Sequence, residues 1–135
     1  MDYPHQIDCV WLATNLSGQL AAMITAGEGP IPENVLAHDF DVMDIEGALL
    51  DLPVIGEARL IEQLPDPSSF LALSQRGLFV YDWTDLHRTH AEAVRSYELV
   101  SVPSVQASLR ALPVELRSAA YDIGTVFGGP FVTVG

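Results

Sequence analysis

The chain contains no lysine, and its first 58 residues contain no arginine either. Ten carboxylates, with no cation other than histidine, give this half a formal charge of −10. Eight carboxylates and six arginines leave the remainder at −2. A one-sided negative field repels nucleic acid and anionic lipid, and it attracts basic surfaces. We therefore expect a basic protein as the partner, and neither nucleic acid nor a membrane.

Cysteine and long apolar runs are also scarce. Because Cys9 is the one cysteine, no internal disulfide can form, and a reducing compartment is expected. No run of about 18 apolar residues is present to span a membrane. The first residues, MDYPHQIDC, lack the basic and then apolar pattern of a signal peptide. These absences predict a cytoplasmic location.

The composition otherwise suits a folded protein. Hydrophobic residues make up 49% of the 135 residues and charged residues 18%, which is too apolar for a disordered acidic tail. The length matches one domain, which buries roughly two thirds of its unfolded surface. We therefore predict a single globular domain over residues 1–135 with an uneven surface charge.

The first half of the chain predicts a hairpin followed by two helices. Two apolar runs, residues 8–14 and 19–25, surround the turn formers at 15–18 and indicate a β-hairpin. Helix is the alternative for Leu20–Ile24, but the short length and Gly18 favour a strand. Pro32 begins a helix to about Ala37. A second helix follows an N-cap at Asp39 or Asp41 and ends at Leu50.

The second predicted helix has distinct faces. Its apolar stripe is formed by Val42, Ile45, Leu49 and Leu52. The carboxylates of Asp44, Glu46 and Asp51 lie off that stripe. Local structure therefore explains part of the acidic cluster.

The second half predicts four further strands and two helices. Strands are expected at 57–62, 78–83 and 97–102, and a last one at 125–134, bent at 128–130. Helices are expected from Pro67 to about Leu73, closed by Gly77, and from Pro113 to Tyr121. Strands and helices occur in runs rather than in βαβ alternation. This order predicts an α+β fold, with a mostly antiparallel sheet and three to four short helices packed on it.

Two histidines raise the alternative of a small metal-assisted hydrolase. On a helix, His87 and His90 would share a face at a spacing that can hold a metal ion, with Asp85 or Glu92 as an oxygen ligand. The segment lacks the HExxH pattern and lies between two predicted strands. A polar loop with solvated histidines explains the same residues better, so we assign no metal, cofactor or catalytic residue.

Two other chemical interpretations fail on the residues themselves. A calcium loop beginning at Asp39 would need an oxygen ligand where Met43 stands and glycine where Asp44 stands. Cys9 lies in an apolar run among acids, which raise a thiol pKa and oppose a nucleophilic thiolate. We interpret it as a core residue.

Four segments carry a resemblance to a known kind of protein. The segments CVWLA and ITAGEGPIP near the start, with GLFVYDWTDLHRT and YELVSVP later, look like a family of small bacterial proteins. The overall character of that family is similar to immunity proteins, which neutralise the toxins of interbacterial competition. The resemblance covers the hairpin, its following loop and two central strands, and it carries over no functional residue.

The resemblance implies a protein-binding module that occludes a basic toxin or nuclease. A nuclease needs a basic cleft because phosphate contacts dominate nucleic-acid affinity, and an acidic face is steered onto such a cleft. The alternatives are an acidic face that only solvates the protein, and an oligomerising module that pairs through exposed strand edges. The predicted partner-binding residues are Glu28, Glu33, Asp39, Asp41, Asp44, Glu46 and Asp51.

Overall fold

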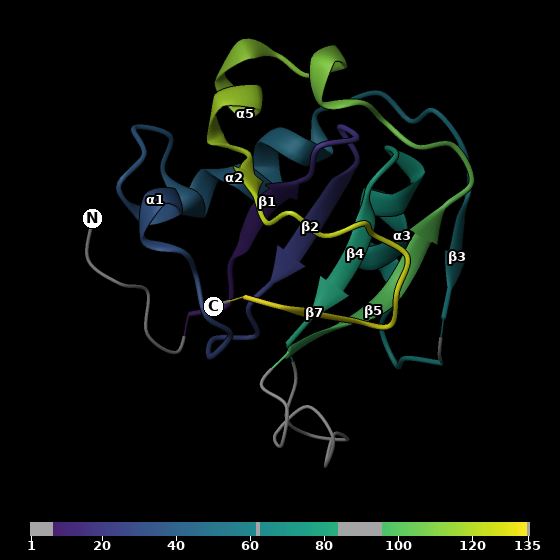
Figure 1. Cartoon of the computed structure of the whole chain (residues 1–135). Coiled ribbons are helices and arrows are strands. Elements are labelled where there is room, and N and C mark those ends of the chain that lie inside the picture. Colours follow the sequence, from purple (N-terminus) through teal and green to yellow (C-terminus); the bar gives the residue numbers. More distant parts are fainter. Residues whose placement is uncertain (1–6, 62, 84–95, 135) are drawn as a thin grey trace.

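The computed structural model describes residues 7–61, 63–83 and 96–134, and a seven-stranded β-sheet lies at its centre (Figure 1). The strands are β1 (Val10–Thr14), β2 (Leu20–Ile24), β3 (Ala58–Leu60), β4 (Phe79–Asp82), β5 (Ser96–Pro103), β6 (Tyr121–Asp122) and β7 (Phe131–Thr133). The helices of the described residues are α1 (Glu33–Leu36), α2 (Val42–Leu50), α3 (Ser68–Gln75) and α5 (Val114–Ala119), with a 3₁₀ turn at Leu109–Ala111. None of these helices has the length and apolar content of a membrane span.

The sheet is mixed, and one of its parallel pairs lies at the centre. The strand order is β3-β5-β4-β2-β1-β6, and β7 pairs with β5 outside this path. Pairing is antiparallel for β1–β2, β3–β5, β4–β5 and β5–β7, whereas β2–β4 and β1–β6 are parallel. For the described residues, the predicted α+β fold with a mostly antiparallel sheet is thus confirmed, and the parallel pairs refine it.

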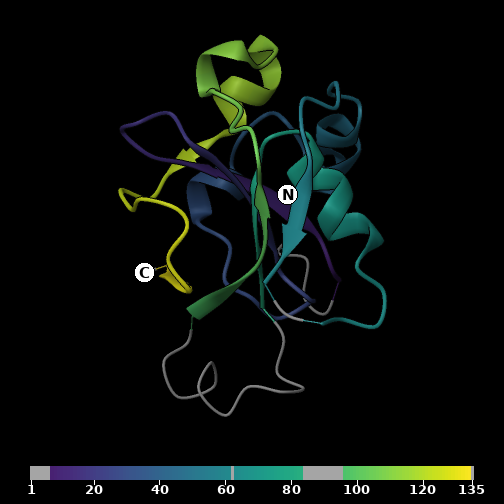
Figure 2. The same ribbon diagram turned by 90° about the vertical axis from the view of Figure 1, so that its right-hand side faces the viewer.

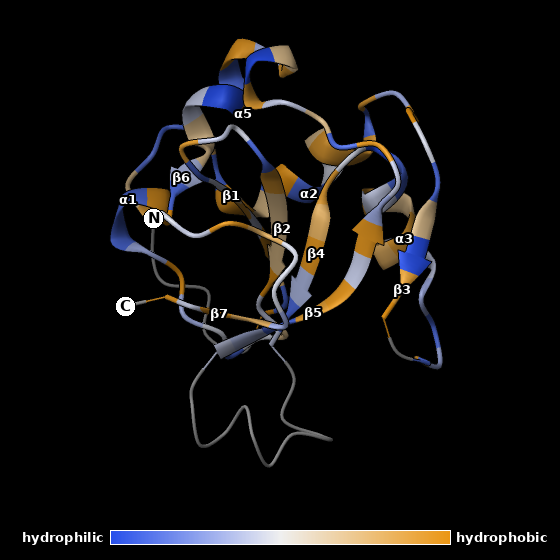
Figure 3. Cartoon of the chain, turned by 45° about the vertical axis from the view of Figure 1, so that its right-hand side comes forward, coloured by the Kyte–Doolittle hydropathy of each residue, from blue (hydrophilic) through white to orange (hydrophobic). Residues whose placement is uncertain are grey.

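The three neighbouring strands β1, β2 and β4 are buried at every position. The predicted hairpin is confirmed as β1 and β2, and its turn contains Gly18 at φ 77°. Leu20–Ile24 is a strand because pairing with β1 and β4 on its two sides outweighs the helix preference of its residues. In β4 both the face of Phe79 and Tyr81 and the face of Val80 and Asp82 are buried. Figure 3 accordingly shows hydrophobic residues running through β2, β4 and β5.

Two helices cover one face of the sheet. Figure 2 shows the sheet nearly edge-on, with α3 on one side and the C-terminal segment on the other. Ser101 of β5 donates a hydrogen bond to Ser74 of α3 (2.7 Å), and Ser74 donates to the carbonyl of Leu78 (2.9 Å). Arg76 donates to the carbonyls of Leu52 (2.9 Å) and Ala72 (2.8 Å), so it joins the ends of α2 and α3. The helical layer is therefore fixed by backbone acceptors as well as by apolar contacts.

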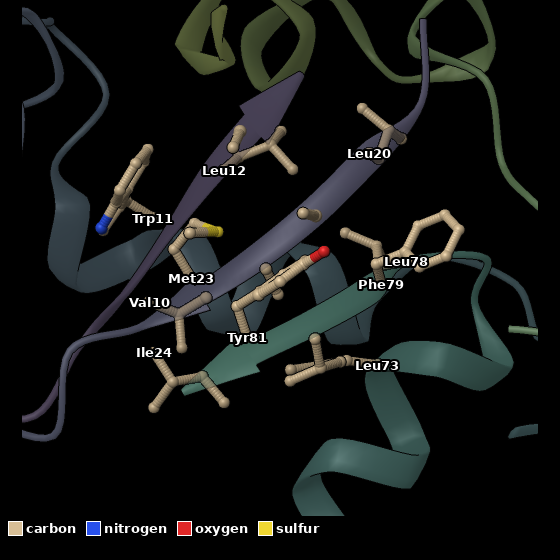
Figure 4. Close-up of a cluster of buried hydrophobic side chains, with 14 of the residues drawn as sticks. Val10, Trp11, Leu12, Leu20, Met23, Ile24, Leu73, Leu78, Phe79 and Tyr81 are labelled. Atoms are coloured by element: carbon tan, nitrogen blue, oxygen red, sulfur yellow. The ribbon is translucent and has the colours of Figure 1, made fainter. Parts of the chain in front are cut away.

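Aromatic side chains fill the opposite face. Val80 pairs with Ser101, the partner of α3, so the next residue, Tyr81, points away from the helices. Tyr81 is a register neighbour of Met23, which pairs with Trp11, and the three lie side by side in Figure 4. Tyr97 accepts a hydrogen bond from the Trp11 indole (3.2 Å). Its hydroxyl also donates to the carbonyl of Pro30 (2.8 Å).

The C-terminal segment, residues 123–134, crosses this aromatic face (Figure 1). The Phe127 ring lies 6.1 Å from the ring of Phe79 and 6.1 Å from that of Tyr81. The buried Tyr81 hydroxyl donates to the carbonyl of Gly129 (2.8 Å) and accepts from the amide of Gly128 (3.1 Å). The tyrosine is thus the point at which the segment is tied to the sheet.

Two predicted elements of the second half were wrong in their bounds. The last helix ends at Ala119, because Tyr121 and Asp122 pair with Ala13 and Thr14 as β6. The predicted strand at 125–134 is reduced to β7. Before β7, hydrogen bonds to side chains of the turn between β1 and β2 take the place of strand pairing. Asn15 donates to the carbonyl of Thr125 (2.8 Å), and Gln19 accepts from the amide of Phe127 (3.1 Å).

We expect Tyr81→Phe to loosen the C-terminal segment while the rest of the sheet stays folded. The variant loses both hydroxyl hydrogen bonds, so the free energy of unfolding should fall by about 1 kcal/mol. Amide hydrogen exchange at residues 127–134 should accelerate more than exchange in β1 and β2.

Tyr121→Phe is the matched control, because no hydrogen bond of its hydroxyl occurs within the described residues. Equal effects of the two substitutions in urea unfolding and hydrogen exchange would contradict the role given to Tyr81.

Candidate functional site

Three of the predicted partner-binding carboxylates lie together around the start of α2, and a fourth lies in α1, the helix before it. Glu33 is in the first turn of α1, and Asp39, Asp41 and Asp44 surround the N-terminus of α2. Asp41 is the N-cap, where its side chain accepts from the amide of Met43 (2.9 Å), so the cap is Asp41 and not Asp39. All four are exposed, and within the described ranges none of them forms an ion pair. We call these four residues the α2 acidic end.

The other three predicted residues lie elsewhere. Asp51 is the C-cap of α2, roughly 15 Å from Asp41 at a rise of 1.5 Å per residue. Glu46 flanks the buried stripe of α2, is half-buried, and lines a different cavity. Glu28 lies in the loop between β2 and α1. The seven predicted residues are therefore divided among α1, the two ends and one flank of α2, and the loop between β2 and α1.

A groove begins beside the α2 acidic end. It consists of two cavities of about 350 and 340 Å³ that share His38 and Ser118. The larger is lined by Asn34, Val35, His38, Ser118, Ala119, Ala120, Tyr121 and Asp122. The smaller is lined by His38, Asp39, Phe40, Glu115 and Ser118. We call the two cavities together the acidic groove, because its charged walls come from both halves of the chain.

The folding of two short segments places these walls. α5 buries Leu116 and Ala119, which leaves Glu115 and Ser118 together on one flank of the helix. Arg117 falls on the other flank by the same periodicity, and no arginine of the described residues lines the groove. On the opposite wall, the amide of Phe40 donates to Nδ1 of His38 (3.0 Å). A neutral His38 ring therefore carries its proton on Nε2.

Half of this groove was not predicted from the sequence. Asp39 was a predicted site residue, whereas Glu115, Asp122, Tyr121 and His38 were not. The i, i+3 spacing of Glu115 and Ser118 was the available signal for a shared helix flank. Nothing in the sequence indicated that this flank would face residues 34–40, because that contact depends on how β6 pairs with β1.

A smaller cavity surrounds the one cysteine. It measures about 230 Å³ and is lined by Asp8, Cys9, Val10, Ile24, Ala26, Glu46, Ser69, Phe70 and Asp82. Burial raises the pKa of the Cys9 thiol, the Thr25 hydroxyl at 3.7 Å lowers it to a lesser degree, and Asp8 and Glu46 raise it further. The side chain is 6% exposed. The predictions that Cys9 is a core residue and that its pKa is raised are confirmed, with burial as the larger cause.

The metal-site alternative falls on His87 and His90, which lie outside the described residues. In the part of the chain that the structure describes, no group of three His, Cys, Asp or Glu side chains is arranged to hold a metal ion. The segment beginning at Asp39, which lacks the ligands of a calcium loop, provides Asp41 as the N-cap of α2.

Comparison with protein-family models, with curated proteins and with solved structures found no match to this chain. The resemblance to immunity proteins therefore stays a prediction, and function is argued below from the chain's own geometry.

We expect Asp41 to stabilise α2 mainly as a hydrogen-bond acceptor, and less through its charge. Asp41→Ala removes the acceptor for the Met43 amide and should lower the free energy of unfolding by about 1 kcal/mol. Asp41→Asn keeps an acceptor oxygen and should cost less than half as much in urea unfolding. Equal losses for both variants would contradict a capping role.

We also expect Cys9 to contribute a pH-dependent part of the stability. Its pKa is raised in the folded chain, so the folded state holds the thiol proton more tightly than the unfolded state does. The contribution is complete below the unfolded pKa, about 8.5, and is lost as the pH rises through the folded value.

Urea unfolding of the wild type and of Cys9→Ala at pH 7 and pH 10 measures this effect. The wild type should lose more unfolding free energy than the variant between the two pH values. Parallel losses would show that the thiol proton is not coupled to folding.

Proposed function

We propose that this chain is a protein-binding module of the immunity type, which covers a basic surface of a toxin or nuclease. The observation that carries the proposal is the exposed and unpaired state of Glu33, Asp39, Asp41 and Asp44 beside a groove that no described arginine lines. Internal ion pairs would cancel such a field. Its persistence at the surface supports a partner of opposite charge.

The α2 acidic end would act mainly on the rate of association. Exposed carboxylates are screened beyond about 8 Å at physiological salt, so they guide a basic partner over the last part of its approach. Charges of this kind add less to the affinity of the final complex. They also resemble the row of phosphates that a nuclease cleft binds, which favours occlusion of that cleft.

The groove would supply the affinity that steering does not. Val35 and Ala119 are buried at its base, and Phe40 and Tyr121 are half-buried along it. Apolar and aromatic area that loses water on binding stabilises a complex more than rim charges do. The proposed interface therefore has an apolar centre and an acidic border.

Affinity capture with three versions of the tagged chain tests this function. The wild type should retain a basic protein from the source cells at low salt and release it at high salt. The variant Glu33→Gln/Asp39→Asn/Asp44→Asn should retain far less, because three steering charges are lost while the Asp41 cap remains.

The control is Asp8→Asn/Glu57→Gln/Asp66→Asn, which changes the net charge equally at exposed positions outside the predicted partner-binding residues. It should capture as the wild type does. No basic partner, or equal loss in both variants, would count against the proposed function.

A further inference from the structure

We infer that the acidic groove recognises arginine side chains of an extended segment of the partner, an inference that rests on the proposed function. Each of its two cavities combines one aromatic side chain with at least one carboxylate. Tyr121 and Asp122 line the larger cavity. Phe40, Asp39 and Glu115 line the smaller one.

This combination matches arginine better than lysine. A guanidinium group is planar, stacks on aromatic rings and donates two parallel hydrogen bonds to a carboxylate. An ammonium group is more strongly hydrated and makes no bidentate pair. Because the pattern occurs in both cavities, the groove fits a segment that carries at least two arginines.

The carboxylates are available for such contacts. Glu115 and Asp39 are exposed, and their side chains make no ion pair within the described residues. Asp122 uses one oxygen to accept from the amide of Gly124 (2.8 Å), which leaves its second oxygen for a donor. The hydrogen bond from the Phe40 amide leaves the Nε2 proton of a neutral His38 free to donate to a backbone carbonyl of the segment.

The apolar base supports the same occupant. Val35 is 3% exposed and Ala119 is 6% exposed, so the base of the groove is part of the packed core. Tyr121 is held at one end by an edge-on contact with Trp11, with ring centroids 6.4 Å apart. The aliphatic part of an arginine side chain packs on such a base while its charged head meets the rim.

Two synthetic peptides of alternating glycine and either arginine or lysine, three cations each, test the inference on the full chain. Titration followed by amide chemical shifts should place the arginine peptide at residues 34–40 and 115–122. The lysine peptide should bind about fivefold more weakly, since it lacks stacking and bidentate contacts. Shifts concentrated elsewhere, equal affinity of the two peptides, or no binding of either would overturn the inference.

A pair of matched variants separates the groove from net charge. Glu115→Gln/Asp122→Asn should weaken the arginine peptide by about fivefold, and Glu57→Gln/Asp66→Asn by less than about twofold. Asp122→Asn keeps the acceptor for the Gly124 amide. If the double variant fails to fold, Glu115→Gln alone serves, and it should weaken binding in the same direction. Equal weakening by both pairs would overturn the inference.

The same variants distinguish failure of the arginine inference from failure of the proposed function. In the capture experiment, a partner that is lost with Glu33→Gln/Asp39→Asn/Asp44→Asn but kept by Glu115→Gln/Asp122→Asn would leave the function standing and overturn the arginine recognition inferred for Glu115 and Asp122. A partner lost with both would support the groove as part of the interface. Absence of any partner would remove the proposed function itself.

Discussion

The parallel pairing of β2 with β4 is the constraint on which the rest of the molecule depends. Parallel neighbours need a long crossover, and here residues 25–78 supply it, with α1, α2, β3 and α3 inside it. Most of the acid-rich sequence belongs to this crossover. The carboxylates therefore lie around the edge and the helical face of the sheet. The central strands could not hold them, because every position of those strands is buried.

Side-chain hydrogen bonds from the sheet complete what strand pairing leaves open. The hydroxyls of Tyr81 and Tyr97 hold segments far away in the sequence, at Gly129 and Pro30. Asn15 and Gln19 do the same from the hairpin turn. Each bond satisfies backbone groups of a segment without regular structure, which is the usual role of polar side chains at the border of a core.

The sequence alone predicted local structure well and spatial neighbours poorly. The Asp41 cap, the α2 stripe and the strands β1, β2 and β4 follow from short-range patterns, and the structure has them. Tyr121 was assigned to a helix because its pairing partner, Ala13, lies more than a hundred residues away. The groove could not be predicted from the sequence for the same reason, since the pairing of β6 with β1 brings Glu115 close to Asp39. The charge distribution of the sequence predicted Asp39 on one wall, whereas Glu115 and Asp122 on the other became evident only from the topology.

The C-terminal segment that crosses the aromatic face also sets an order of events during synthesis. Phe79 and Tyr81 leave the ribosome well before Phe127, which packs on both rings in the folded chain. Until residues 123–134 emerge, the nascent protein presents an uncovered apolar sheet, a surface that invites aggregation or chaperone binding. Residues 123–134 thus complete the cover of this face only after the strands beneath them have been made.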